Sequence, residues 1–474
     1  MHPQTVLTLA LLPSLSTAAE TVLGVYIFSR HGDRTAKSTP PTILTDLGYS
    51  EVFSSGTWFR NHYIANGSPA QIHGIAPDIV KLSQITASSP LDSVLMPSAL
   101  GFLQGLYPPV GSTLAQETLR NGTVVQAPLN GYQFIPVGVV SSGTLSEDTA
   151  WLQGSGNCAN AIISSNNYFI SPEYKTLDQS TRGFYTSLGP VINATIPADQ
   201  TSFKNAFTIF DLINVAEIHN ATIPSSDLLT NDTLTQLRTL ADTHEFNLAY
   251  NASDPIRAIA GATLAAEVLQ ALNKTVAGAG KAPVTIQFGF YAQFQAFFGL
   301  ADLTQTNPDF FGIPDYASTM TFELFTNAAP SPFPKPEDIN VRFFFHNGTT
   351  GNNSAPVAYP LFGRTDNSLP WNDFVTGINK FAIGNQPAWC EACGNSTGVC
   401  ASPSTSSSRS TSTGSGSSSS GGVSKAVAGV IGAMVTLAVI LGVEAIVMLI
   451  AGLRLVKKNR LNAAMRQGSD TLKA

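Results

Sequence analysis

Two arginines flank a histidine and a glycine in a short run near the start of the chain, Arg30-His31-Gly32-Asp33-Arg34-Thr35. Arginine presents a permanent charge on a planar fork of N–H donors, which suits the oxygens of a tetrahedral dianion. A histidine nitrogen can serve as a nucleophile, and a glycine lets the backbone approach closely. Although a surface arginine pair beside a structural histidine is the alternative, these residue types at this spacing favour a site for a phosphoryl group.

The residues before this run indicate how it is positioned. Residues 25–28 are mostly apolar and read as the end of a buried strand. The chemistry is therefore predicted at the carboxyl end of a strand near the start of the chain.

The run resembles the signature of the histidine acid phosphatases, the branch of the histidine phosphatase superfamily that includes secreted phytases. The resemblance implies that His31 is the catalytic nucleophile, which becomes phosphohistidine, and that Arg30 and Arg34 bind the phosphate. It also implies an α/β fold with a mostly parallel central sheet flanked by helices, and an inserted α-helical cap domain at about residues 144–273. The expected partner is phosphate or a phosphomonoester, with no metal and no organic cofactor.

Other parts of the family's site are not matched. The run at residues 105–108, GLYP, resembles the end of a family helix, but the place of a third phosphate-binding arginine holds Asp92 or Ser93. The strand at residues 283–291 ends in Phe290-Tyr291, where the family has a His-Asp pair that binds phosphate and protonates the leaving group.

A missing proton donor should lower the rate. A positioned general acid contributes about 10²–10⁴-fold, so we expect little hydrolysis of alkyl phosphates. The rate of hydrolysis should fall least for activated esters, whose leaving groups need no proton. Asp33 and Asp92 are possible substitute acids, although an added anion would repel phosphate.

The remaining elements fit an α/β scaffold. Thr45 is expected to cap a helix that runs to about Ile64. A strand is predicted at residues 81–87 and a helix at about 97–107. Residues 322–324 and 341–345 are expected to pair as a strand hairpin.

Composition limits the functional classes. The chain has 474 residues, of which 43 % are hydrophobic and 12 % charged, so it can form a large core. Its formal charge of −6 argues against nucleic acid as a partner.

The N-terminal residues and the sequons indicate the secretory pathway. Residues 1–19 resemble a signal peptide, and the folded ectodomain is expected over residues 20–400. Ten N-x-Ser/Thr sequons are predicted glycosylation sites of a glycoprotein. These are Asn66, Asn121, Asn193, Asn220, Asn231, Asn251, Asn273, Asn347, Asn352 and Asn395.

The chain has four cysteines, Cys158, Cys390, Cys393 and Cys400. In a secreted protein they predict two disulfides, for which three pairings are possible. The spacing of Cys390 and Cys393 alone does not indicate zinc, because no second such pair or suitable histidine pair is present.

The C-terminal part reads as a membrane anchor. Residues 401–422 are a Ser/Thr/Gly-rich stalk, and residues 423–453 are predicted to be one transmembrane helix. The basic residues in the tail, 454–474, place that end in the cytoplasm. A single-pass type I protein at the cell surface or an endomembrane is expected.

Two functional interpretations follow. The first is a membrane-anchored extracellular acid phosphatase that hydrolyses phosphomonoesters weakly through His31. The second is a non-catalytic pseudophosphatase that acts as a cell-surface binding or structural glycoprotein.

Overall fold

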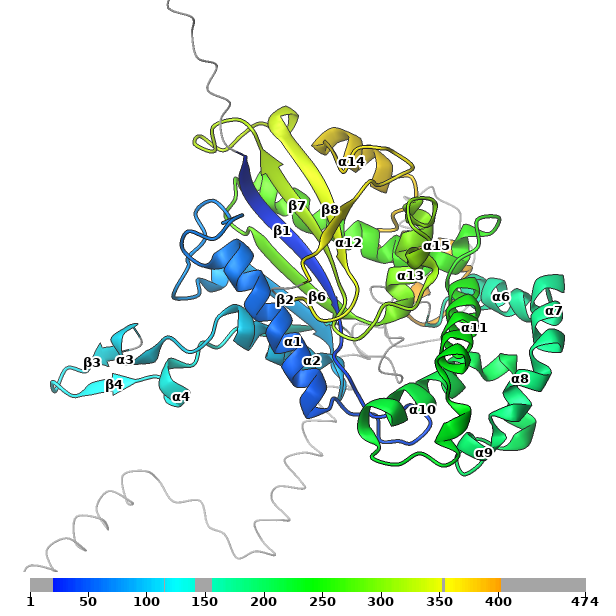
Figure 1. Ribbon diagram of the computed structural model, residues 1–474. Helices are drawn as coiled ribbons and strands as arrows, with labels where there is room; N and C mark the ends of the chain where they lie inside the picture. The colour runs from blue at the N-terminus through cyan, green and yellow to red at the C-terminus, as the bar shows by residue number, and fades with distance from the viewer. Residues whose placement is uncertain (1–19, 115, 141–155, 352–353, 402–474) are drawn as a thin grey trace, which may run out of the picture. The chain divides into compact units, whose positions relative to one another are not determined.

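The computed structural model describes residues 20–114, 116–140, 156–351 and 354–401 (Figure 1). The predicted signal peptide, stalk, transmembrane helix and cytoplasmic tail lie outside these residues. Among the described residues, no helix is both long and apolar enough to cross a bilayer.

An eight-stranded sheet forms the centre of the fold, with the strand order β10-β8-β7-β1-β6-β2-β5 and β9 paired to β8. The strands are β1 (Thr21–Arg30), β2 (Ile85–Pro90), β5 (Val137–Val140), β6 (Val284–Gly289), β7 (Thr319–Thr326), β8 (Ile339–His346), β9 (Val357–Tyr359) and β10 (Ser368–Pro370). The α/β class with helices flanking a central sheet is confirmed.

The prediction that the sheet is mostly parallel is wrong. Strands β1, β6, β2 and β5 run parallel to one another, whereas β7 pairs antiparallel with β1, and β8 pairs antiparallel with β7, β9 and β10. The expected hairpin of β7 and β8 is present. Its connection, residues 327–338, contains no crossover helix, and a direct return of this kind joins antiparallel strands.

Strand β1 lies in the middle of the sheet, and its two faces pack into different cores. Val25 and Ile27 pack with helices α1 (Asp46–Phe59) and α2 (Leu95–Leu106). Tyr26 and Phe28 pack on the other face with α12 (Ile259–Ala277), α13 (Tyr291–Leu300) and α14 (Trp371–Ile378). Burial on both sides explains why the strand reads as a nearly continuous apolar run.

Helix α1 begins where the sequence predicts. The Thr45 side chain accepts a hydrogen bond from Gly48 N at 3.1 Å, and the helix continues through a π-helical turn at Arg60–Ile64. Gly32 approaches this helix so closely that an added Cβ would lie 2.1 Å from the Gly48 carbonyl oxygen. The glycine of the motif therefore seats the loop after β1 on the start of α1.

A group of helices packs beside the sheet (Figure 1). They are α6 (Ala159–Asn167), α7 (Pro172–Ser180), α8 (Arg182–Ser187), α9 (Gly189–Ile192), α10 (Ala206–His219) and α11 (Asn231–Ala249). Most of them share a separate apolar core that includes Tyr185, Phe203 and Leu237. The predicted cap, about residues 144–273, also takes in α12, which packs against the sheet in this structure.

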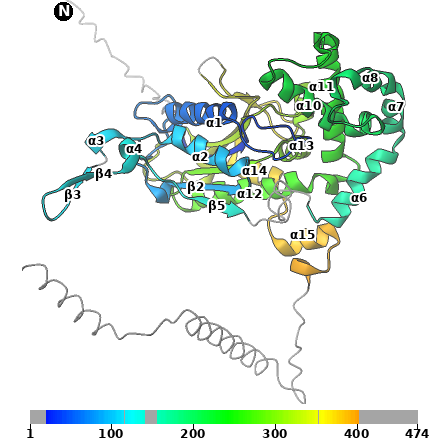
Figure 2. The same ribbon diagram turned by 90° about the horizontal axis from the view of Figure 1, so that it is seen from below.

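An arm extends from the helices around β2 and β5 and was not expected from the sequence (Figures 1 and 2). It contains α3 (Gly111–Leu114), the antiparallel strands β3 (Gln116–Thr118) and β4 (Val124–Gln126), and α4 (Pro128–Gly131).

Two disulfides are present, Cys158–Cys393 and Cys390–Cys400. The first joins the residue before α6 to the end of α15 (Gln386–Cys393), which lies near α6 in Figure 2. The structure thereby selects one of the three possible pairings, and no cysteine is free.

Candidate active site

The candidate site lies where the parallel strands β1 and β6 end. Arg30, the last residue of β1, pairs in register with Gly289, the last residue of β6. The loop that follows β1 and the first residues of α13 therefore lie side by side at this edge. Helices α10 and α11 and the segment before β7 complete the surroundings.

His31 is held as a neutral imidazole. Its side chain is buried, and its Nδ1 lies 2.8 Å from the Gly32 carbonyl oxygen. Because a carbonyl can only accept, Nδ1 carries the hydrogen in this contact, and the lone pair is on Nε2. Burial, followed by the charges of Arg30 and Arg34, lowers the pKa of His31 well below 6.5. This tautomer presents a nitrogen nucleophile.

Arg30 lies next to the histidine between two aromatic rings. Its Nη1 donates to the Pro314 carbonyl, and its Cζ lies 4.7 Å from the Tyr316 ring centroid and 5.4 Å from that of Tyr291. The side chain is 4 % exposed, and its Nε has no hydrogen-bond partner among the described residues. A donor buried in this way is available to an anionic ligand.

Arg34 forms an ion pair with a carboxylate on α10, one of the helices beside the sheet. It is fully buried, and its Nη2 lies 3.0 Å from Oδ1 of Asp211, while its Nη1 donates to Oδ2 at 3.2 Å. Asp211 lies on α10 and also accepts a hydrogen bond from Lys37 N at 2.8 Å. The carboxylate fixes the guanidinium and offsets part of its charge.

Tyr316 covers the motif. Its ring centroid lies 5.6 Å from that of His31, and the Cζ of Arg34 lies 5.9 Å from it. Burial raises the pKa of Tyr316 to about 12, so the phenol stays neutral. The aromatic ring forms one wall of the site beside the nucleophile.

Asp33, one of the two predicted substitute acids, has structural partners. Its Oδ2 accepts from Thr45 Oγ1 at 2.5 Å and lies 2.6 Å from Nε2 of His219. Its backbone N–H donates to Glu51 at 2.7 Å. These contacts join the loop to α1 and α10.

Asp92, the other predicted substitute acid, lies at the start of α2. Its Oδ1 accepts from the backbone N–H groups of Val94 and Leu95 at 2.7 and 2.5 Å. Such contacts satisfy donors at a helix N-terminus. A role of Asp33 or Asp92 as an acid stays a prediction.

Phe290 and Tyr291 occupy the edge next to the motif, as the sequence indicated. Phe290 follows β6 directly, and Tyr291 begins α13. The Tyr291 hydroxyl donates to Glu245 Oε2 at 2.6 Å, and Glu245 Oε1 lies 2.7 Å from His244 Nδ1. A carboxylate therefore reaches this edge from α11 of the cap.

Sequence reasoning missed Glu245, Asp211 and Tyr316. Glu245 follows His244 in the sequence, and this His-Glu dipeptide was the available signal. It lies on another element and 46 residues before Tyr291, so only the fold shows that the two meet.

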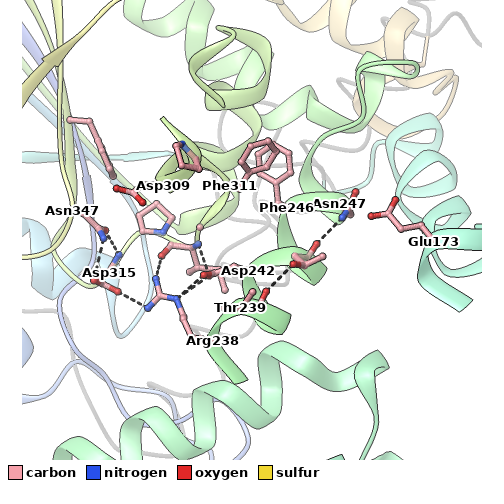
Figure 3. Close-up of a pocket in the computed structure, with 16 residues that line it drawn as sticks. Glu173, Arg238, Thr239, Asp242, Phe246, Asn247, Asp309, Phe311, Asp315 and Asn347 are labelled. Carbon is pink, nitrogen blue, oxygen red and sulfur yellow. Dashed lines mark hydrogen bonds and ion pairs between the residues drawn. The ribbon is translucent and has the colours of Figure 1, made fainter. Parts of the chain in front are cut away.

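One cavity opens beside the motif, and a second cavity adjoins the first. One, of about 400 Å³, is lined by Arg30, Glu51 and Tyr316. The other, of about 700 Å³, is drawn in Figure 3 and shares Arg238 and Asp315 with the first. Among the described residues, no group of three or more His, Cys, Asp or Glu side chains is arranged to hold a metal ion.

The predicted glycosylation sites differ in exposure. Seven of the asparagines are exposed, Asn251 and Asn395 are half-buried, and Asn352 lies outside the described residues. The Asn395 amide donates to the Asn157 carbonyl at 2.5 Å and so is engaged. Use of these sequons stays a prediction.

A family model described as histidine phosphatase superfamily (branch 2) matches residues 38–346, more than half of the chain. The chain belongs to this branch. The matched segment begins just after the Arg30–Arg34 motif and spans the cap and most of the sheet. A search of the curated proteins found no match.

Solved structures of phytases share the fold of this branch 2 member. The Hafnia alvei phytase in complex with tartrate is 12 % identical, with a TM-score of 0.52, covering 78 % of this chain and 99 % of that one. The Citrobacter braakii phytase is 13 % identical, with a TM-score of 0.52, covering 79 % of this chain and 99 % of the other. At this level of identity the likeness concerns the fold alone.

Proposed function

We propose that this branch 2 member binds phosphomonoesters through Arg30, His31 and Arg34, and that His31 attacks the phosphorus to form a phosphohistidine. The reaction is slow for alkyl esters and is confined largely to esters with activated leaving groups. The observation that carries the proposal is the buried, neutral His31, whose Nδ1 donates to the Gly32 carbonyl and whose pKa is lowered by burial and by the charges of Arg30 and Arg34.

The chemistry follows from what each side chain can supply. Nε2 of His31 donates its electron pair to phosphorus, and the bond from phosphorus to the leaving oxygen breaks. The guanidinium groups of Arg30 and Arg34 stabilise charge on the phosphoryl oxygens. Water then hydrolyses the phosphohistidine and returns the free imidazole.

The leaving group limits the rate. Phe290 offers no proton, and the Tyr291 hydroxyl donates to Glu245. Without a positioned carboxylic acid, an alkoxide leaves poorly, whereas a nitrophenolate needs no proton.

Trapping the phosphorylated protein tests this proposal. The purified full-length chain is mixed with an activated aryl phosphate at mildly acidic pH and quenched within a single turnover. We expect a phosphohistidine label that is lost in His31→Ala and kept in His73→Ala, a control at an exposed histidine. A label that persists in His31→Ala, or none in the wild type, contradicts it.

The second candidate function is a pseudophosphatase that binds phosphomonoesters without turnover. It is favoured by the aromatic residues that end β6 and by Asp92 at the start of α2. Binding of phosphate in titration calorimetry, together with no phosphohistidine, identifies this case.

We also propose that the folded part is the ectodomain of a single-pass type I glycoprotein. The signal-like N-terminus, the sequons and the apolar run at residues 423–453 support this, and two disulfides are typical of an oxidising compartment. Labelling of intact cells with a membrane-impermeant reagent and glycosidase treatment test it. If the protein is not labelled in intact cells, surface exposure is contradicted. If its electrophoretic mobility does not change after glycosidase treatment, glycosylation is contradicted.

A further inference from the structure

The two cavities beside the motif are unusually acidic for a site that binds an anion. Six carboxylates line them, Glu51, Glu173, Asp211, Asp242, Asp309 and Asp315. The cationic side chains in the same walls are Arg30 and Arg238.

Some of the positive charge in and near these walls is neutralised by ion pairs with carboxylates. Arg238 lies 3.0 Å from Asp242 and 2.8 Å from Asp315, as the dashed lines in Figure 3 show. Asp211 is paired with Arg34. Glu51, Glu173 and Asp309 have no ion pair among the described residues, so the walls of the two cavities keep excess negative charge.

Arg30 anchors the phosphate end of a ligand. It lines the smaller cavity, is 4 % exposed, and has an Nε without a hydrogen-bond partner among the described residues. The ester's alcohol portion then extends from Arg30 toward Arg238 and Asp315, which both cavities share.

Aromatic rings lie between the acidic groups. Phe207 and Phe210 line the smaller cavity, and Phe246, Phe311 and Phe345 line the larger one, where Phe311 is 46 % exposed. A cation is attracted both to an aromatic face and to nearby carboxylates. A second phosphate in the same place would instead face like charges.

We propose that this site selects phosphomonoesters whose alcohol portion carries a positive charge, such as aminoalkyl phosphates, and disfavours polyanionic inositol phosphates. Arg30 holds the phosphate, and the carboxylates and phenylalanines of the two cavities hold the cation. This inference rests on the proposed phosphomonoester site and specifies its substrate class.

Binding of three ligands tests the inference without depending on turnover. Titration calorimetry on the purified full-length chain compares 2-aminoethyl phosphate with propyl phosphate, which has the same shape without the charge, and with inositol hexakisphosphate. We expect the aminoethyl ester to bind roughly 5- to 10-fold tighter than the propyl ester. The hexakisphosphate should bind more weakly than either.

A charge-neutralising variant locates the effect. Glu51→Gln with Asp315→Asn should bring the two esters to within about 2-fold of each other, because two carboxylates of the cavity that Arg30 lines are neutralised. The control, Glu117→Gln with Asp227→Asn, makes the same change in net charge at exposed positions that do not line these cavities, and should keep the preference.

The outcomes separate the two proposals. If both esters bind but the propyl ester or the hexakisphosphate binds at least as well as the aminoethyl ester, the substrate class is wrong and the phosphomonoester site stands. A preference that survives Glu51→Gln with Asp315→Asn also overturns it. If neither ester binds, the proposed function fails, and this inference fails with it.

Discussion

The ends of two neighbouring parallel strands differ sharply in chemistry. At the end of β1, Arg30 and His31 are buried beside each other, with the imidazole neutral and Nδ1 hydrogen-bonded. After the end of β6, Phe290 and Tyr291 present two aromatic rings, and the Tyr291 hydroxyl donates a hydrogen bond to Glu245. In the proposed function, the β1 edge binds the phosphoryl group and supplies the nucleophile, whereas Phe290 and Tyr291 at the β6 edge include no carboxylic acid.

The proposed function treats phosphoryl attack and protonation of the leaving group as separable tasks. Attack on phosphorus needs a nucleophile and positive charge, which the loop after β1 contains within five residues. Protonation of the leaving group needs an acid on a different strand. Under the proposed function, we therefore expect that loss of the acid leaves phosphate binding largely intact and narrows the range of esters that react.

The largest expected effect concerns the ion pair of Arg34 and Asp211 next to the end of β1. Asp211→Asn should destabilise the protein by about 3 kcal/mol, because it leaves the buried charge of Arg34 without its ion partner. Denaturant unfolding measures this. Asp178→Asn is the control, since its exposed pair with Arg182 should contribute less than about 1 kcal/mol. Equal losses of stability in the two variants would show that the buried Arg34 pair stabilises the protein no more than the exposed pair does.

Arg30 should dominate phosphate affinity. Arg30→Ala removes the buried guanidinium beside His31 and should weaken phosphate binding by roughly 10²-fold, with Arg30→Lys in between because it keeps the charge but not the planar fork. Titration calorimetry with inorganic phosphate measures the change. Arg182→Ala, at an exposed arginine, should leave the affinity unchanged. Undiminished affinity in Arg30→Ala would place the phosphate elsewhere.

The buried imidazole predicts a pH dependence of stability. The pKa of His31 is lowered in the folded state, mainly by burial, so below about pH 6.5 the unfolded chain binds a proton that the folded protein excludes. The contribution of neutral His31 to stability is fully present above the pKa of the unfolded chain and is lost as the pH falls. The free energy of unfolding then changes by up to about 1.4 kcal/mol per pH unit. Unfolding curves of the wild type and His31→Gln between neutral and mildly acidic pH should differ by this slope. Parallel curves would contradict a neutral buried His31.

The smallest effect is expected at the β6 edge. Tyr291→Phe loses the hydrogen bond to Glu245 and should cost about 1 kcal/mol of stability, while the rate of phosphohistidine formation changes less than about 2-fold. Tyr185→Phe is the matched control, since this buried hydroxyl has no hydrogen-bond partner among the described residues. A large fall in the rate with Tyr291→Phe would make Tyr291 the missing proton donor.

The sequence predicted features that depend on neighbouring residues. The apolar run before Arg30 predicted β1, and Thr45 predicted the start of α1, because strand burial and helix capping are local patterns. The position of Phe290 and Tyr291 directly after a strand was also predicted, since the apolar pattern of that strand is recognisable.

Contacts between distant segments were not predictable in the same way. Arg34 and Asp211 are 177 residues apart, and each alone resembles an ordinary charged residue. The antiparallel direction of β7 depends on the path that the chain takes between β6 and β7, which a strand pattern does not specify. The substitute acids Asp33 and Asp92 were chosen by proximity in sequence, whereas the fold brings Glu245 to Tyr291.

The central claim is that the nucleophile is retained while the acid is lost. The most direct test is the rate of phosphohistidine formation for a series of aryl and alkyl phosphates with leaving groups of increasing pKa. We expect the rate to fall by about tenfold per unit of leaving-group pKa, because the leaving oxygen departs without a proton. A rate nearly independent of the leaving group would reveal a working proton donor and contradict the account.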